Sequence, residues 1–506
     1  MTKRETDAAS AATRPLDHVD AVVIGAGSGG LTVAVGLVKV GKRVALVERG
    51  DVGGDCTNVG CIPSKTLIDL AKALPPNVRG DDRAASARAV LAEVRARRDA
   101  LRAHEELVLA GTGGLELVRG TATLVAHADG PPLVVVTDDD GAKRTLRARH
   151  VIVATGSAPI TIDVPGLPAE RTLTNATLFE LSSPPEHLAI LGAGPIGCEM
   201  AFAFADLGSR VSLLDLAPRV LPRAEAEASA IVHGALVRAG VRVLPGSTAT
   251  RYDTERSALH ALEGDVPHVL EGVDRVLMAI GRRPASAGLG LEELGVTLEP
   301  SGAVRTDGDH RTAAPGVFAI GDVTGRAITT HAANAQGRRL VRRIVLPLPL
   351  VREGDYPNVT FSRPEVAQIG PTRAELEAVF APELLASHRF DLADTDRGLT
   401  LGLEEGYVRV TAMRLTGRLL AATIVGPSAG EMIHLLTHAQ RSRMSLWRLS
   451  RLVVAYPALA DAIRAVADAF VFASLPALPS EALTYVQHRW RRPTPPAAPP
   501  PTGTTT

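Results

Sequence analysis

Residues 21–30 read Ala-Val-Val-Ile-Gly-Ala-Gly-Ser-Gly-Gly, a short apolar run that ends in spaced glycines. We expect the run to form a buried strand that leads through a glycine turn into a helix ending near residue 40. In a dinucleotide-binding turn of this kind Gly25 makes the bend, Gly27 lets the backbone reach a pyrophosphate, and Gly30 lets the helix pack closely on the strand. The stretch therefore predicts the first half of a nucleotide-binding βαβ unit.

A second strand completes this unit. Residues 43–47 are mostly apolar and lead into Glu48, whose carboxylate can accept hydrogen bonds from ribose hydroxyls. Strand, turn, helix and acid follow one another in the expected order, which supports nucleotide binding better than the glycines alone would.

Two of the three cysteines lie directly after this unit, in Gly-Gly-Asp-Cys-Thr-Asn-Val-Gly-Cys-Ile-Pro-Ser-Lys at residues 53–65. Gly54 and its neighbouring glycines free the backbone to bend and to approach a flat ring. Pro63 fits the first turn of a helix, so Cys61 should lie near a helix N-terminus, where the dipole favours a thiolate. A metal clip would need more ligands nearby, and a structural bridge would be unusual without an export signal. We interpret Cys56 and Cys61 as a redox dithiol beside a redox cofactor.

The glycine pattern recurs from residue 189, with Gly192, Gly194 and Gly197 in the turn and Asp215 at the end of the following strand. This internal repeat predicts a second dinucleotide. Because the dithiol follows the first unit, we assign FAD to that unit and a nicotinamide cofactor, NAD or NADP, to the second. Asp215 favours NAD, since a carboxylate accepts a 2′-hydroxyl and repels a 2′-phosphate, although Arg219 nearby weakens this preference.

Residues 53–65 resemble the active-site signature of the flavin-dependent pyridine nucleotide–disulfide oxidoreductases, the family of dihydrolipoyl dehydrogenase, glutathione reductase and mercuric reductase. Similar resemblances lie at Ala-Thr-Gly 154–156, Met-Ala-Ile-Gly-Arg-Arg-Pro 278–284 and Val-Phe-Ala-Ile-Gly-Asp 317–322. The resemblance extends over residues 20–475. It implies an α/β fold with two Rossmann-like dinucleotide-binding domains, for FAD and NAD(P), and a C-terminal α/β dimerisation domain in a homodimer.

The resemblance also implies roles for single residues. Cys56 would be the outer thiol that meets the acceptor, Cys61 the inner thiol against the flavin, and Lys65 a partner of Glu199 near the flavin. Asp322 would hold the ribityl chain. The remaining residues that we expect to contact cofactors are Thr155, Gly156 and Gly321 for FAD and Gly281 for NAD(P).

Composition shifts and the resemblance divide the chain into six segments. These are a disordered lead (1–18), the first part of the FAD-binding domain (19–160), the NAD(P)-binding domain (161–284), the second part of the FAD-binding domain (285–350), the dimer-interface domain (351–475) and a Pro-rich tail (476–506).

Two positions depart from the family pattern. Disulfide reductases of the family carry a histidine where Tyr456 stands and a glutamate where Asp461 stands, and that pair supplies a proton at the thiols. A tyrosine, with a pKa near 10, is a poor proton carrier at neutral pH. Mercuric reductases do carry a tyrosine in this region, but they end in a cysteine pair that this chain lacks.

We therefore expect electrons to pass from NAD(P)H through FAD and the Cys56–Cys61 disulfide to a small acceptor, as in a dihydrolipoyl dehydrogenase-like disulfide reductase. One alternative is a mercuric-reductase-like enzyme that uses Tyr456 to bind a metal ion or quinone. Another is a redox-sensing flavoprotein whose Pro-rich tail contacts a partner. The motifs predict the redox machinery but not the acceptor.

Composition limits the other possibilities. The 506 residues carry no formal net charge and have a pI near 7.3, which argues against nucleic acid or a membrane surface as partner. No apolar run is long enough to span a membrane, and few cysteines suit a reducing compartment, so we expect a cytoplasmic protein. His434 and His438 have a metal-compatible spacing but no third ligand nearby, so we expect no metal site. Cys198 is expected in the core.

Overall fold

The computed structural model describes residues 17–75, 80–128, 130–326, 328–346, 354–482 and 486. They form two compact units. The first contains the chain up to residue 356 together with residues 360–363, and the second contains residues 357–359 and the chain from residue 364 on. The division falls a few residues after the boundary predicted at 350. The predicted disordered lead lies outside the described residues up to residue 16, and the predicted tail lies outside them from residue 483 on, residue 486 excepted.

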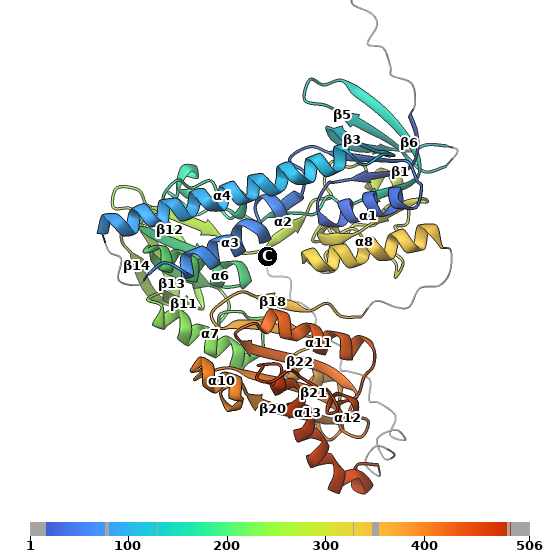
Figure 1. Ribbon diagram of the computed structural model, residues 1–506. Helices are drawn as coiled ribbons and strands as arrows, with labels where there is room; N and C mark the ends of the chain where they lie inside the picture. The colour runs from blue at the N-terminus through green and yellow to red at the C-terminus, as the bar shows by residue number, and fades with distance from the viewer. Residues whose placement is uncertain are drawn as a thin grey trace, which may run out of the picture. The chain divides into compact units, whose positions relative to one another are not determined.

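A seven-stranded sheet organises the first unit (Figure 1). Its strands are β1 (Asp17–Ile24), β2 (Val44–Glu48), β3 (Leu115–Arg119), β4 (Thr121–Val125), β5 (Leu133–Thr137), β6 (Lys143–Val153) and β17 (Val317–Ala319). The order is β3-β2-β1-β6-β5-β4, with β17 also paired to β6, and β1, β2, β3, β6 and β17 run parallel. Strand β1 begins at Asp17 and not at the expected Asp20, because pairing with β6 extends to that residue.

Both faces of this sheet are covered. Ala21 and Val23 of β1 face one apolar core, which they share with helices α1 (Ser28–Lys39) and α8 (Thr330–Val345). The alternate residues Val22 and Ile24 face a second core on the other side. Helices α1 and α8 lie side by side (Figure 1). The alternation explains why β1 reads as a continuous apolar run.

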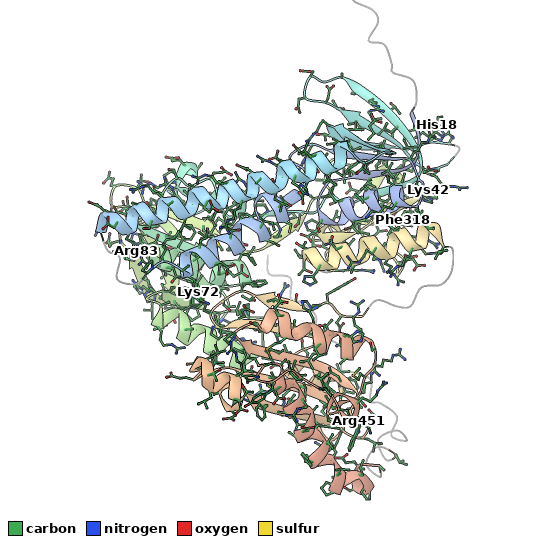
Figure 2. All side chains as sticks on the ribbon, viewed as in Figure 1. His18, Lys42, Lys72, Arg83, Phe318 and Arg451 are labelled. Atoms are coloured by element: carbon green, nitrogen blue, oxygen red, sulfur yellow. The ribbon has the colours of Figure 1, made fainter. Side chains whose placement is uncertain are left out.

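The redox stretch forms two helices that pack against a long one. Helix α2 (Gly54–Asn58) and helix α3 (Cys61–Lys72) contact the Arg-rich helix α4 (Gly80–Ala110). Figure 2 shows Lys72 at the end of α3 near Arg83 at the start of α4. The charged residues of α4 form ion pairs such as Arg97–Glu93, so this helix has the solvated face that its mixed charges predict.

A second parallel sheet repeats the first arrangement. Its strands, in the order β11-β10-β9-β15-β8, are β8 (Thr172–Leu173), β9 (His187–Leu191), β10 (Arg210–Asp215), β11 (Arg242–Pro245) and β15 (Arg275–Met278). Helix α6 (Pro195–Leu207) follows β9, and α7 (Ala226–Arg238) follows β10. The remaining strands of this region form an antiparallel sheet of β12 (Ser247–Asp253), β13 (Ala258–Glu263) and β14 (Val266–Leu270).

A two-stranded ribbon joins the regions of the two sheets. Strand β7 (Ser157–Pro159) follows the first sheet, and β16 (Arg282–Pro284) follows the second. They pair antiparallel, with Arg282 opposite Pro159. The chain therefore leaves the first sheet and returns to it at neighbouring points.

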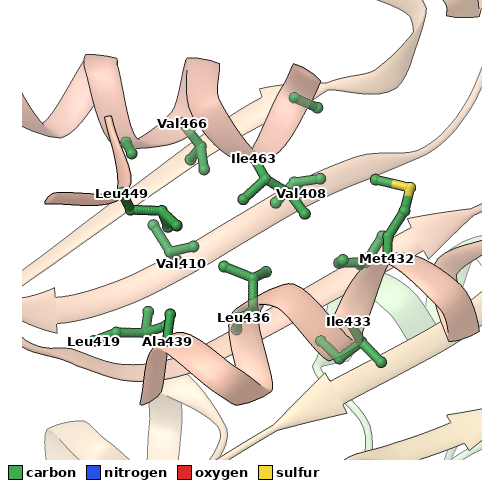
Figure 3. Packing of buried hydrophobic residues seen from close by; sticks show 14 of the residues in the cluster. Val408, Val410, Leu419, Met432, Ile433, Leu436, Ala439, Leu449, Ile463 and Val466 are labelled. Atoms are coloured by element: carbon green, nitrogen blue, oxygen red, sulfur yellow. The ribbon is translucent and has the colours of Figure 1, made fainter. Parts of the chain in front are cut away.

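The second unit is a five-stranded sheet covered by helices. The strand order is β18-β19-β22-β21-β20, made by β18 (Asn358–Thr360), β19 (Glu365–Ile369), β20 (Leu385–Asp391), β21 (Tyr407–Met413) and β22 (Leu419–Gly426). Helix α11 (Ala429–Arg441) packs on β19 and β22, and α13 (Asp461–Ser474) on β20 and β21. Figure 3 shows Leu436 and Ile463 of these helices meeting Val408 and Val410 of β21.

One helical stretch in the described part of the chain, Asp461–Ala482, is long and apolar enough to cross a membrane by length and composition alone. Its residues Ile463, Val466 and Phe470 are fully buried in the core of the second unit. Core helices of globular proteins satisfy the same criterion, so this one stretch is weak evidence for a membrane span.

Candidate active site

In the first glycine turn two of the three glycines leave no room for a side chain, and the third has open space around it. Gly25 has φ +102°, and a Cβ atom there would lie 2.4 Å from the carbonyl oxygen of Ala154. A Cβ atom on Gly30 would lie 1.9 Å from the carbonyl oxygen of Gly25. Gly27 has an ordinary φ of −77°, and its nearest neighbour, the Cα atom of Gly54, would be 3.9 Å from such a Cβ atom. No atom of the described residues requires glycine at position 27, so the turn leaves room here for the close approach of a ligand.

The second turn has the same three properties. Gly192 has φ +105° and would clash with the carbonyl of Ala279, while a Cβ atom on Gly197 would lie 1.8 Å from the carbonyl oxygen of Gly192. Nothing lies within 4 Å of a Cβ atom placed on Gly194, the residue that caps helix α6. Both turns therefore present an open glycine at a helix N-terminus, where backbone amides bind phosphate.

A carboxylate holds each turn in the same way. Glu48 accepts hydrogen bonds from the amides of Ala26 (2.6 Å) and Gly50 (2.8 Å). Asp215 accepts from the amides of Ala193 (2.5 Å) and Ala217 (2.7 Å). Each carboxylate thus joins the strand end to the turn and keeps free lone pairs for a ribose hydroxyl.

Arg219, the residue that weakened the preference for NAD, is engaged within its own loop. Its Nη2 atom donates to the carbonyl oxygens of Pro222 (2.9 Å) and Ala224 (3.1 Å). These two hydrogen bonds use only Nη2 and tie the guanidinium to its own loop, so the preference for NAD stays a prediction.

The redox loop lies against the first glycine turn. The amide of Gly53 donates to the carbonyl of Ala26 (2.9 Å), and a Cβ atom on Gly54 would lie 2.7 Å from the Cα atom of Gly27. The structure therefore brings the cysteine segment to the position where a dinucleotide pyrophosphate is expected, and only glycine fits at position 54.

The two thiols differ in charge. Cys61 is the first residue of α3, and the pKa of its thiol is lowered to about 6, chiefly by a hydrogen bond from Cys56 and further by Thr330 and the charge of Lys65. Burial and Glu199 act in the opposite direction. The pKa of Cys56 is raised, chiefly because its thiol donates to Cys61. The hydrogen bond between the two thiols thus favours the thiolate on Cys61 and the proton on Cys56.

Lys65 and Glu199 meet as the resemblance implied. The Nζ atom of Lys65 lies 2.7 Å from Glu199 Oε2 and 4.6 Å from the centre of the Phe361 ring. Glu199 Oε1 accepts the backbone amide of Phe361 at 2.9 Å. The side chain of Glu199 is only 6% exposed, so the ammonium and the amide together satisfy a buried carboxylate.

The other expected flavin residues lie around the ends of β6 and β17. Thr155 donates to the carbonyl of Ala285 (2.6 Å), and the amide of Gly321 donates to Gln336 Oε1 (2.7 Å). Gly156 has positive φ, and so does Gly281, the residue that we expect to contact NAD(P). Asp322 accepts a hydrogen bond from the hydroxyl of Ser157 (2.7 Å). Burial raises the pKa of Asp322, while Ser157 and the charge of Arg282 lower it.

Tyr456 and Asp461, both in the second unit, have separate partners. Tyr456 is 81% exposed, and its hydroxyl donates to Asp396 of α10 (Asp396–Leu401), which raises the pKa of Tyr456. Asp461 begins α13 and accepts two hydrogen bonds from Arg464, at 2.9 and 3.1 Å. The hydroxyl partner of Tyr456 is therefore Asp396, which the sequence did not single out.

Residues that could hold a metal do not gather in the described ranges: no group of three or more His, Cys, Asp and Glu side chains forms a candidate site there. His434 and His438 are exposed on α11, where His438 contacts the hydroxyl of Ser442. Cys198 is fully buried and donates to the carbonyl of Ala193 (3.3 Å).

Comparison with known families agrees with this geometry. A family model described as pyridine nucleotide-disulphide oxidoreductase matches residues 19–337, and the model of the dimerisation domain of that family matches residues 356–467. This chain belongs to the pyridine nucleotide-disulphide oxidoreductase family. The predicted family and fold class are thereby confirmed.

Similar relatives of this oxidoreductase carry two different names. A mercuric reductase from Streptomyces lividans is 35% identical over 465 residues, which cover 89% of this chain and 96% of the relative. A dihydrolipoyl dehydrogenase from Chlorobaculum tepidum is 35% identical over 459 residues, which cover 88% and 95%.

Solved structures of the family superpose on this oxidoreductase over most of its length. The HOCl-induced flavoprotein disulfide reductase RclA from Escherichia coli, solved as a Cu(II) complex, is 25% identical with a TM-score of 0.79, and the match covers 90% of this chain and 100% of RclA. LpdA from Mycobacterium tuberculosis is 26% identical with a TM-score of 0.79, over 89% and 99%.

Enzymes of this family use FAD and NAD(P)H, and this chain is accordingly a flavoprotein oxidoreductase. The two open glycines at positions 27 and 194 fit the pyrophosphates of two dinucleotides.

Proposed function

We propose that this flavoenzyme reduces a small disulfide, as a dihydrolipoyl dehydrogenase does, with NADH preferred over NADPH. The observation that carries the proposal is the position of Cys61 at the N-terminus of α3, where its sulfur lies 3.3 Å from the Thr330 hydroxyl and Cys56 and Lys65 also lower the pKa of its thiol. When bound, FAD supplies transfer of two electrons between the nicotinamide and the sulfur pair. The chain would hold the nicotinamide at one end of that transfer and the Cys56–Cys61 pair at the other.

Residues of the first sheet and its loops would hold the FAD. The proposed contacts are Gly25, Gly27, Gly30, Glu48, Gly54, Lys65, Thr155, Gly156, Gly321 and Asp322. In the second sheet, Gly192, Gly194, Gly197, Asp215 and Gly281 would hold the nicotinamide nucleotide. These sheets correspond to the proposed FAD-binding domain (19–160 and 285–350) and NAD(P)-binding domain (161–284).

The thiols would reduce a disulfide by two exchanges. Cys56 loses its proton and attacks one sulfur of the acceptor, which forms a mixed disulfide and releases one thiolate that takes up this proton. The Cys61 thiolate then attacks the Cys56 sulfur, closes the Cys56–Cys61 disulfide and releases the second thiolate. Atoms and charge balance without a further reactant. Lys65 and Thr330 stabilise the Cys61 thiolate until that second step.

A second candidate acceptor is a soft metal ion or a quinone. Tyr456 supports this alternative, because its exposed hydroxyl replaces the histidine of the disulfide reductases and one 35% identical relative is named mercuric reductase. The solved Cu(II) complex of RclA also supports a metal ion. In this case Tyr456 would bind the acceptor and no general acid would be needed. With either acceptor, Asp461 would not act through Tyr456, because the Asp461 carboxylate is paired with Arg464.

The match to the dimerisation domain supports a homodimer, formed through residues 351–475, and we propose a cytoplasmic enzyme.

Turnover of the purified holoenzyme with NADH and with NADPH should be measured against lipoamide, glutathione disulfide, mercuric ion, quinones and oxygen. We expect the highest kcat/KM with NADH and a disulfide. Higher kcat/KM with mercuric ion or a quinone would favour the second candidate, and a chain that cannot be reconstituted with flavin would contradict both.

A further inference from the structure

Arg282 lies at the centre of a hydrogen-bonded chain that connects the redox loop with Asp322. Its side chain is only 14% exposed. Its Nε and Nη2 atoms donate to the hydroxyl and the carbonyl of Ser157, each at 2.7 Å, and Nη2 also donates to the carboxylate of Asp55. The hydroxyl of Ser157 in turn donates to Asp322 at 2.7 Å. Hydrogen bonds thus connect four residues from four separate segments of the chain, in the order Asp55, Arg282, Ser157, Asp322.

The direction of these hydrogen bonds is fixed by chemistry. A guanidinium can only donate, so the Ser157 oxygen must accept from Arg282 and must give its own proton to Asp322. Asp55 and Asp322 therefore share the charge of Arg282. Asp55 contacts Arg282 directly, whereas Asp322 is connected through Ser157, and its Oδ2 atom lies 4.0 Å from Arg282 Nε. The arrangement gives the more buried carboxylate, Asp322, a hydrogen-bond donor and leaves Asp55 half-exposed.

Asp55 immediately precedes Cys56 in helix α2. This helix has five residues, too few to be stable alone, and it enters through Gly53 and Gly54, both at positive φ. A segment of this kind needs external contacts to fix its position. On the side of the glycines the Gly53 amide donates to Ala26, at the first turn of the helix Asp55 forms an ion pair with Arg282, and further along the Thr57 hydroxyl donates to Glu105 of α4.

We propose that Asp55 is a positioning residue for the outer thiol. Through Arg282 and Ser157 it holds the first turn of α2, and with it Cys56, against the β7–β16 ribbon. The inference rests on the proposed role of Cys56 as the thiol that meets the acceptor. It assigns to Asp55 no contact with substrate or cofactor.

The matched control is Asp51, which lies in the same segment and forms an ion pair with Arg102 at 2.8 Å. Both carboxylates are more than half exposed on their own side chains, but only Asp55 is connected to the ribbon. Asp55→Asn and Asp51→Asn therefore each remove one negative charge and one ion pair. Only the pair lost in Asp55→Asn connects the redox loop with the ribbon.

The test uses the holoenzyme of each variant reduced with NADH without oxygen. Two quantities are measured, the amide hydrogen exchange of residues 53–60 and the rate at which iodoacetamide alkylates Cys56, by peptide mass spectrometry. In Asp55→Asn we expect both to rise about fivefold, as loss of a partly exposed ion pair implies. Asp51→Asn should match the wild type, and Asp55→Glu should restore most of the effect.

Faster alkylation without faster exchange would show that the Asp55 charge acts only on the thiol and would overturn the proposal. Equal effects in Asp51→Asn and Asp55→Asn would also overturn it. Neither measurement uses an electron acceptor, so a wrong acceptor assignment leaves the result unaffected. Failure of the proposed flavin chemistry would appear separately, as a wild-type protein that binds no FAD.

Discussion

The sulfur of Cys61 lies 3.3 Å from the hydroxyl of Thr330, and each residue is the first of its helix, Cys61 in α3 and Thr330 in α8. Two helix N-termini therefore meet at one sulfur. Their positive ends and the Thr330 hydroxyl all favour negative charge at this point. This geometry favours a thiolate on Cys61, in addition to the hydrogen bond that Cys56 donates to it.

Thr330→Val should raise the pKa of Cys61 by about one unit, because it removes a hydrogen bond to a charged acceptor. The pKa is measured as the pH midpoint of the long-wavelength thiolate-to-flavin absorbance in NADH-reduced holoenzyme. Thr330→Ser keeps the hydroxyl and is the control, for which we expect the wild-type midpoint. A midpoint that stays the same in Thr330→Val would show that the Thr330 hydroxyl does not stabilise the thiolate.

Alkylation of Cys61 should follow its ionisation. With a pKa of about 6, the rate should be constant above pH 7 and fall about tenfold for each unit below the pKa. Folding lowers this pKa from an ordinary thiol value of about 8.5, so thiolate formation stabilises the reduced fold fully above that value. The contribution declines as pH falls and is lost below about 6. Cys61 alkylation that still rises at pH 8 would contradict the assignment.

The Lys65–Glu199 pair predicts opposite changes from its two members. Lys65→Met removes a cation and should raise the Cys61 pKa, whereas Glu199→Gln removes an anion and should lower it. Lys65→Met should also destabilise the holoenzyme by about 2 kcal/mol, since it leaves a buried carboxylate without its ammonium. The double variant should be more stable than Lys65→Met alone. Thermal melting and the same absorbance titration test both effects, and shifts of equal sign in the two single variants would refute the pair.

Asp215 should decide between the nicotinamide nucleotides. We expect wild-type kcat/KM for NADH to exceed that for NADPH at least tenfold, and Asp215→Asn to reduce this ratio by removing the charge that repels a 2′-phosphate. Asp215→Asn should also lower the affinity for NADH, because two backbone amides lose an anionic acceptor. Arg219→Ala is the control. If it changed the ratio more than Asp215→Asn, the guanidinium and not the carboxylate would set the preference.

Tyr456→His should increase lipoamide reduction about a hundredfold, if the missing general acid limits disulfide turnover. Tyr456→Phe should leave disulfide reduction unchanged and lower any turnover with mercuric ion. Steady-state kcat with both acceptors checks these outcomes. A Tyr456→His variant with wild-type activity toward lipoamide would show that proton supply at this position does not limit the reaction.

Local patterns in the sequence predicted much of the fold and the first contacts of the site. The two glycine turns, their acids and the start of α3 at Cys61 follow from spacing within short segments, and the family resemblance predicted Lys65 with Glu199. The contact of Cys61 with Thr330 spans 269 positions, and that of Asp55 with Arg282 spans 227. No local periodicity encodes such pairs. They depend on how the ribbon and α8 return to the first sheet, so they became visible only in the folded chain.

The β7–β16 ribbon also has an evolutionary consequence. Because Pro159 and Arg282 are paired neighbours, the two ends of the segment between them meet. We expect that a nucleotide module of different preference could be exchanged at this junction while the strands on either side stay in register. Only the side chains that cross the junction, above all Glu199 toward Lys65, would have to be carried along with the graft.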